Sequence, residues 1–156
     1  AGVDVVMTAH ITTPNATTDG LPASLSYTMI TERLRGELGF QGVIVTDALE
    51  MNAIKNHFTP EQAAVAALRA GVDVLLMPSD LRAAFDGVVR AVEDGTLSEE
   101  RLNESVRRVL TLKQKAGLDL SGSSEEKQSV PEETSDTKCS VSDWLKKLWY
   151  GADTAA

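Results

Sequence analysis

The sequence contains little of the material from which several common kinds of protein are built. It has one cysteine, Cys139, which excludes an internal disulfide framework and a cysteine-rich metal site. Its two histidines, His10 and His57, are far apart and have no metal-ligand spacing. No apolar run approaches the roughly 18 residues of a membrane-spanning helix. The formal charge of -8 argues against nucleic acid as a partner, because such a partner needs a basic face.

The first residues do not have the composition of a targeting sequence. They lack an initiator methionine and a basic start, and an apolar run begins almost at once, at Val3. A secretory signal peptide needs a basic start and a longer apolar core. We therefore expect the chain to begin inside a fold.

What the sequence does contain is an alternation of apolar runs and helical patterns. Runs rich in Val, Ile and Leu predict buried parallel strands, covered on both faces, at residues 3–8, 42–47 and 72–78. Helical patterns lie between and after them, at residues 26–39, 59–71, 79–95 and 98–117. This order is typical of right-handed βαβ units and predicts an α/β fold.

The helix ends and the buried helix faces are also predicted from the pattern. Thr59 and Gln62 form a capping box and Gly71 ends that helix, while Ser79 and Ser98 start the next two. The first helix has an apolar face of Met29, Ile30, Leu34 and Leu38. The last helix has an apolar stripe of Leu102, Val106, Val109 and Leu110.

The composition changes after Leu120. Residues 121–139 are rich in Ser and Glu and predict a disordered acidic linker. Residues 140–156 predict a short amphipathic helix and tail, with an apolar face of Val141, Trp144, Leu145, Leu148 and Trp149. This helix fits either a docking element that packs on the body or on a neighbour, or a weak anchor at a membrane surface.

Three parallel strands are few for an independent fold, because such a sheet leaves two open edges. A closed (β/α)8 barrel needs about 250 residues, and the body here, residues 1–120, is too short for one. The pattern fits the last three β/α units of such a barrel.

Polar residues at strand ends are the candidates for chemistry. Asp47 lies at the carboxyl end of the second predicted strand, where barrel enzymes place their active sites. It could act as a glycosidase nucleophile, a metal ligand or a general base, or it could cap a helix that starts at Ala48. His10 follows the first predicted strand at the same carboxyl-end edge of the sheet, which we call the rim. It is either a residue of the site or a loop histidine held by hydrogen bonds. Met51 fits a core position, and His57 a surface loop.

Several blocks resemble, in order and spacing, the later part of the catalytic barrel of family 3 glycoside hydrolases, in particular bacterial β-N-acetylhexosaminidases. The resemblance covers about residues 3–118. The blocks are VMTAHI, LPASLSYTMITERLRGELGFQGVIVTDALEMNAI, AVAALRAGVDVLLMP and RLNESVRRVLTLKQKAGL.

The resemblance implies roles for three residues. Asp47 matches the catalytic nucleophile, and His10 and Met51 match positions at the sugar site. The implied reaction is retaining hydrolysis of a terminal β-N-acetylglucosaminide, as in peptidoglycan or chitin fragments, through a covalent glycosyl-enzyme. It requires no metal or organic cofactor.

The resemblance also has gaps. The family's acid/base loop of the KHFPGHGD type has no match in this sequence, so we expect no acid/base residue here and an incomplete barrel that is inactive alone. An N-terminal half-barrel is a possible partner. The alternatives are a non-catalytic product of a truncated or split gene, and a docking protein that acts through Trp144 and Trp149. We expect an extracytoplasmic or cell-envelope location in a bacterium rather than a cytoplasmic one.

Overall fold

The computed structural model describes residues 2–17 and 19–118. The linker predicted at residues 121–139 and the helix predicted at residues 140–156, with both tryptophans, lie outside the described residues. No helix in the described part of the chain is long and apolar enough to cross a membrane.

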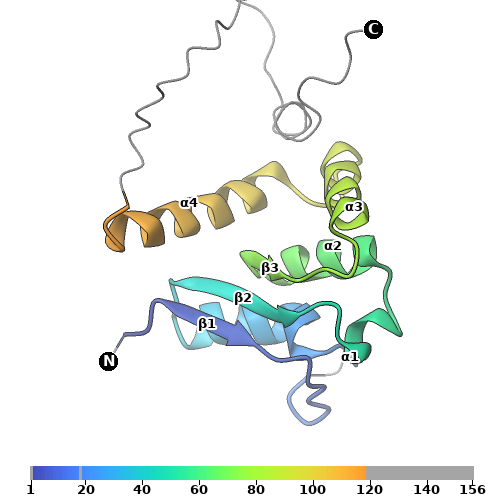
Figure 1. Cartoon of the computed structure of the whole chain (residues 1–156). Helices are drawn as coiled ribbons and strands as arrows, with labels where there is room; N and C mark the ends of the chain where they lie inside the picture. The colour runs from blue at the N-terminus through green and yellow to red at the C-terminus, as the bar shows by residue number, and fades with distance from the viewer. Residues whose placement is uncertain (1, 18, 119–156) are drawn as a thin grey trace, which may run out of the picture.

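The three predicted strands form one parallel sheet in the order β1-β2-β3 (Figure 1). They are β1 (Val5–Thr8), β2 (Val43–Ala48) and β3 (Val74–Leu76). β1 is shorter than predicted because its pairing starts at Val5 opposite Val43, the first residue of β2. β3 starts late because the N–H of Val72 still bonds to the carbonyl of Ala67 in the preceding helix.

Helical segments follow each strand. They are η1 (Ala23–Leu25), η2 (Thr28–Glu37), α1 (Asn52–Lys55), α2 (Pro60–Ala70), α3 (Leu81–Glu93) and α4 (Glu99–Lys115). The predicted capping box is present at the start of α2, where Thr59 and Gln62 bond to each other's backbone N–H. Gly71 ends α2 with φ +113, and a Cβ there would lie 2.4 Å from the Thr31 hydroxyl oxygen. The predicted start of α4 at Ser98 is confirmed as well.

Two local predictions are wrong. The N-cap of α3 is Asp80 rather than Ser79, because the Asp80 carboxylate reaches the N–H of Ala83 at 2.9 Å. Leu38, predicted on the buried face of the first helix, is 76% exposed. That helix is wound as a π-helix that ends at Glu37, and the Leu38 N–H bonds to Arg33 five residues back, just before the chain turns at Gly39.

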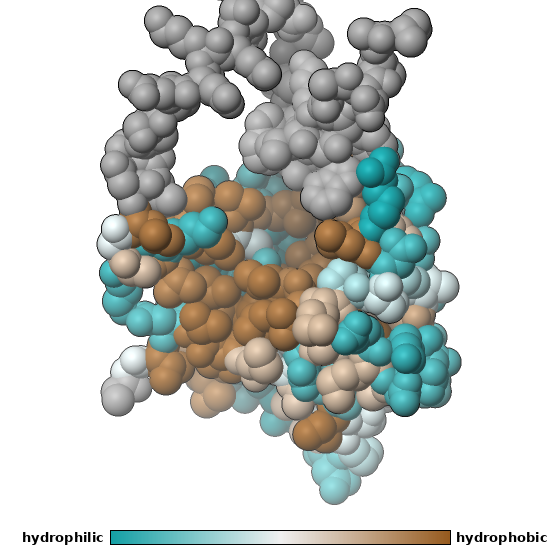
Figure 2. All heavy atoms as spheres, viewed as in Figure 1, coloured by the Kyte–Doolittle hydropathy of each residue, from teal (hydrophilic) through white to brown (hydrophobic). Residues whose placement is uncertain are grey.

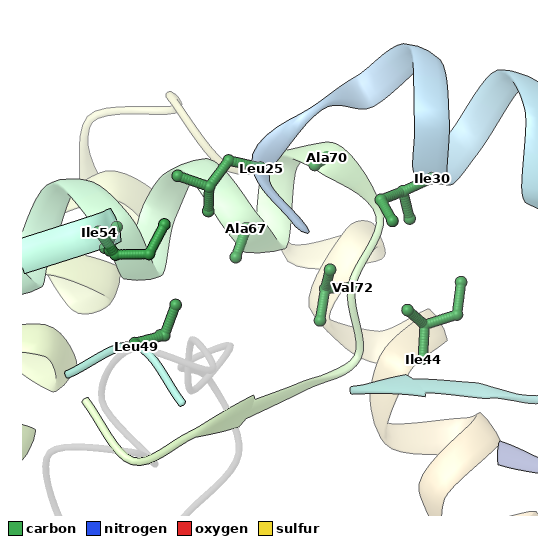
Figure 3. Close-up of a cluster of buried hydrophobic side chains, with 9 residues drawn as sticks. Leu25, Ile30, Ile44, Leu49, Ile54, Ala67, Ala70 and Val72 are labelled. Atoms are coloured by element: carbon green, nitrogen blue, oxygen red, sulfur yellow. The ribbon is translucent and has the colours of Figure 1, made fainter. Parts of the chain in front are cut away.

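One face of the sheet is covered by η2 and α2, which lie behind the strands in Figure 1. The main core lies between these layers, and eight of its side chains are labelled in Figure 3. It consists of Leu25, Ile30, Ile44, Leu49, Ile54, Ala63, Ala67, Ala70 and Val72. Each of these side chains is almost fully removed from water, so this face carries most of the apolar burial that stabilises the sheet.

The opposite face of the sheet is open within the described residues. Val5 and Met7 of β1 point to this side, and Met7 is 59% exposed. Figure 2, viewed as in Figure 1, shows continuous hydrophobic surface on this side. The prediction that the strands are covered on both faces is therefore wrong for the part of the chain that is described. The reason is that η2 and α2 both lie on one side of the sheet, as the helices of a barrel wall do.

Candidate active site

Asp47 lies on the open face of the sheet, at the end where the strands finish. Side chains alternate along a strand, so Val43, Val45 and Asp47 of β2 point to the same side. The register pairs Val43 with Val5 and Val45 with Met7, which places Asp47 on the open face. Asp47 is half-buried. Its carboxylate thus stands at the carboxyl end of a parallel strand, directed away from the helix-covered core.

The structure excludes one of the roles that the sequence left open for Asp47, that of a helix cap. Its Oδ1 accepts a hydrogen bond from the N–H of Ala48 at 2.8 Å, and among the described residues its carboxylate has no other hydrogen-bond partner. The next helix, α1, begins only at Asn52, and its N-cap is Met51. Asp47 therefore does not cap a helix, and that interpretation is wrong.

His10 lies in the loop after β1 and bonds through both ring nitrogens. Nδ1 is 2.6 Å from the Ser24 hydroxyl oxygen, and Nε2 is 3.0 Å from the carbonyl oxygen of Ala48. Ser24 is in η1 and is fully buried. The interpretation of His10 as a hydrogen-bonded loop histidine is therefore confirmed. Both nitrogens are already engaged within the protein, so a direct sugar contact through either of them would break one of these bonds.

Met51 is 44% exposed and is not part of the described core. Its backbone N–H bonds to the carbonyl of Ala48 at 3.1 Å, closing a tight turn after β2. Its side chain lines an open hollow of about 700 Å³ together with Asn52, Lys55 and Ser79. An exposed methionine at this rim suits contact with a ligand better than a place in the core.

The three residues predicted for the site converge on Ala48. The Ala48 N–H bonds to the Asp47 carboxylate, and the Ala48 carbonyl accepts from the His10 ring and from the Met51 backbone. His57 does not belong to this group. It is exposed after α1 and lines a hollow between α2 and α3.

Two residues of this rim could not be identified from the sequence. Ser24 had no signal, because a small polar residue in a turn-rich loop is unremarkable until its partner, 14 residues away, is known. Met77, at the end of β3, has φ +45, a backbone region that non-glycine residues rarely adopt. Its carbonyl accepts the N–H of Glu50, which fixes the segment after Asp47 to β3.

A second acid, Asp73, lies at the opposite end of the sheet, just before β3. Its carboxylate is fully buried and accepts from Arg35 at 2.5 Å, the N–H of Ile44 at 2.9 Å, Ser105 at 2.7 Å and Arg108 at 3.1 Å. Arg101 adds an ion pair at 3.6 Å.

The arginines around Asp73 respond to this burial. Loss of water lowers the pKa of Arg35 and of Arg101, while the charge of Asp73 opposes that effect. The cluster ties η2, β2, β3 and α4 together at the end of the sheet where the strands begin.

α4 packs differently from its prediction because of this cluster. Val106 is 53% exposed and Leu110 is also exposed, so half of the predicted apolar stripe faces water. The side directed inward carries Arg101, Ser105 and Arg108 instead. The prediction was wrong for these positions because the buried carboxylate of Asp73 selects the polar face of the helix.

Within residues 2–17 and 19–118, no group of three or more His, Cys, Asp or Glu side chains is placed to hold a metal ion. The candidate site is therefore described by one carboxylate, Asp47, and by the hydrogen bonds that hold the strand end beside it.

Comparisons with known proteins identify the family of the chain. Residues 1–112 match the family model described as the glycosyl hydrolase family 3 N terminal domain. The chain therefore belongs to glycosyl hydrolase family 3. The domain has a TIM-barrel-like α/β fold, consistent with the three parallel strands and their helices.

Two curated relatives and one solved structure illustrate the match. The chain is 38% identical over 130 residues to "Beta-hexosaminidase A" of Pseudoalteromonas piscicida, covering 71% of this chain and 22% of that protein. It is 33% identical over 127 residues to "Beta-N-acetylglucosaminidase/beta-glucosidase" of Cellulomonas fimi, covering 76% and 22%.

The solved structure is a family 3 β-N-acetylglucosaminidase from Paenibacillus sp. It shares 40% identity with this chain at a TM-score of 0.73, covering 94% of this chain and 28% of that one. The chain thus spans between a fifth and a third of the length of these relatives.

Proposed function

We propose that this chain forms the last three β/α units of a glycosidase barrel and carries its nucleophile, Asp47. The observation that supports this most directly is the position of Asp47 at the carboxyl end of β2, on the open apolar face. In a closed barrel that face becomes the interior, and that end carries the active site. The remaining strands would cover the apolar surface that includes Val5 and Met7.

The proposed reaction is hydrolysis of a terminal β-N-acetylglucosaminide with retention of configuration. An oxygen of Asp47 attacks the anomeric carbon, the bond from that carbon to the leaving oxygen breaks, and the leaving alcohol takes a proton from a general acid. Water then attacks the same carbon, releases the sugar and restores the carboxylate. Names of relatives that contain hexosaminidase or N-acetylglucosaminidase support this sugar. Peptidoglycan and chitin fragments are the substrates that we propose to present it.

The second group of the reaction is proposed to come from an N-terminal half of the barrel. A retaining enzyme needs its acid/base group roughly 5 Å from the nucleophile. Asp47 has only the Ala48 N–H as a hydrogen-bond partner among the described residues. We therefore expect the 156-residue chain alone to leave a chromogenic N-acetylglucosaminide intact. Turnover by that chain, abolished in Asp47→Ala, would show that an N-terminal half is unnecessary.

A chimera tests the nucleophile directly. Residues 1–118 replace the matching segment of the Paenibacillus enzyme, which supplies the rest of a barrel. We expect the chimera to hydrolyse the chromogenic substrate, and Asp47→Asn to lower kcat by on the order of 10⁴-fold or more, because the attacking oxygen is lost. His57→Ala, a change outside the rim, is the matched control and should keep kcat. A folded chimera with equal activity with Asp or Asn at position 47 would contradict the proposal.

A further inference from the structure

The side chain of His10 continues the hydrogen-bond ladder of the sheet beyond the point where the backbone ladder stops. The pairing of β1 with β2 ends at Thr8 opposite Thr46. β2 continues for two more residues, and there the carbonyl of Ala48 accepts from His10 Nε2 at 3.0 Å. A half-buried histidine from the loop thus takes the place of a backbone donor that β1 no longer supplies.

The hydrogen bonds define the tautomer of the neutral His10 ring. A carbonyl oxygen only accepts, so His10 Nε2 carries the proton that it donates to Ala48. In the neutral ring Nδ1 is then the acceptor, and the Ser24 hydroxyl donates to it at 2.6 Å. Ser24 is 0% exposed, so water does not compete for this bond. The Ala48 carbonyl therefore sets the tautomer of the ring, and the buried Ser24 hydroxyl holds the ring in its orientation.

The peptide that His10 contacts is held from both sides. The carbonyl of the Ala48–Leu49 peptide accepts from His10, and its N–H donates to the Leu76 carbonyl at 2.9 Å. The adjacent peptide N–H, that of Ala48, bonds to the Asp47 carboxylate at 2.8 Å. A rotation of the first peptide moves the Ala48 backbone, and with it the only hydrogen bond that orients the carboxylate among the described residues.

We propose that His10 is a positioning residue that sets the orientation of the Asp47 carboxylate through Ala48, with Ser24 fixing its ring. This inference rests on the proposed role of Asp47 as nucleophile. It replaces the substrate-binding role predicted for His10, because both ring nitrogens bond within the protein. A nucleophile must be held to within about half an ångström of its productive position. A hydrogen bond that fixes the next residue, Ala48, therefore affects the rate.

The first test uses the whole 156-residue chain and its backbone amide resonances. In His10→Ala we expect the Ala48 and Leu49 amide signals to shift and their hydrogen exchange to accelerate. In His10→Gln, whose amide N–H can reach the Ala48 carbonyl, we expect both to return toward the wild type. The ring signals of His10 should show the tautomer protonated at Nε2. His57→Ala should leave all of these signals in place.

The second test measures rate in the chimera. His10→Ala should lower kcat by about 100-fold, the effect of a misplacement near 1 Å, while KM changes little, because the sugar contacts are intact. His10→Gln should recover most of that loss. A residue that binds substrate would raise KM instead, and that result would overturn the inference.

The outcomes separate the two proposals. Unchanged Ala48 and Leu49 signals in a folded His10→Ala chain would overturn the positioning role whatever the chimera does. In another outcome the amide signals of the chain shift in His10→Ala and return in His10→Gln while the chimera with the native Asp47 is inactive. That result would support the positioning contact through Ala48 and contradict the nucleophile proposal. If the Ala variant does not fold, the ring tautomer and the Gln variant still decide the inference.

Discussion

Two aspartates at opposite ends of the same sheet have opposite environments. Asp73 precedes β3, is fully buried and is surrounded by arginines and by backbone and hydroxyl donors. Asp47 ends β2, is half-buried and has one backbone N–H as its partner among the described residues. The same kind of side chain is therefore surrounded by partners at one end of the sheet and, among the described residues, has a single backbone donor at the other.

The difference follows from what a buried charge requires. A carboxylate without water is tolerated only when other groups compensate its charge and fill its lone pairs, as the Asp73 cluster does. A nucleophile needs the reverse, because a lone pair that attacks a substrate must remain unoccupied. In parallel α/β barrels the bottom end serves stability and the top end serves function, and the role proposed for Asp47 would place the two aspartates on the two sides of that division.

The largest expected effect comes from removing the charge of Asp73. Asp73→Asn should lower the free energy of unfolding by about 3–5 kcal/mol, because it leaves the buried guanidiniums of Arg35 and Arg101 without their counter-charge. The measurement is urea unfolding followed by far-UV circular dichroism. The matched change Asp47→Asn should cost less than about 1 kcal/mol, since an amide oxygen still accepts the Ala48 N–H. Equal losses in the two variants would refute the contrast between the two ends.

A smaller effect is expected from Ser105, which bridges the cluster. Its hydroxyl donates to Asp73 at 2.7 Å and accepts from Arg101 at 2.8 Å. Ser105→Ala should lower the free energy of unfolding by about 1–3 kcal/mol, since two buried groups lose a partner while Arg35 and Arg108 keep theirs. Thr111→Ala, at an exposed position of α4, is the control and should cause no loss. A loss at Thr111 as large as that at Ser105 would contradict the prediction, because Ala favours a helix more than Ser or Thr and no bridge to Asp73 is removed at Thr111.

The smallest effect is expected from pH at Asp19, in the loop that follows β1. The Ser26 hydroxyl donates to its carboxylate at 2.5 Å, and this bond lowers the pKa of Asp19 from its ordinary value of 3.8. A lowered pKa means that the bond stabilises the loop above about pH 4 and is lost as the pH falls through the folded-state pKa.

The Leu21 amide, which donates to the same carboxylate, reports this titration. Its resonance should move with a midpoint below 3.8 and should not titrate in Asp19→Asn. A midpoint at or above 3.8 would contradict the prediction. Because Asp19 is exposed, the stability of the whole chain should change little over the same range.

The parts of the fold that depend on neighbouring residues could be predicted well. The order of strands and helices follows from the apolar periodicity, and the capping box of Thr59 and Gln62 follows from a four-residue pattern. The position of Asp47 at a strand end was predicted for the same reason. That Asp47 does not cap a helix could not be predicted, because it depends on where the next helix begins, at Asn52.

The orientation of α4 shows why the rest could not be predicted. Hydrophobic periodicity assumes that the apolar face of a helix is buried. In α4 the inward side carries Arg101, Ser105 and Arg108, because a carboxylate 32 residues before Ser105 lies beneath it. An aspartate inside the apolar run of residues 72–78 was the signal available, since such an acid must find partners.

The sequence by itself determined which segments are strands and helices, where most of them end, and that an acid stands at the end of β2. Only the tertiary structure decided what surrounds each acid. The His10 ring reaches Ser24 14 residues away and Ala48 38 residues away, and the Asp73 cluster joins four elements. Local propensity acts over a few residues, whereas compensation of a buried charge and orientation of a carboxylate depend on groups that meet only after the chain has folded.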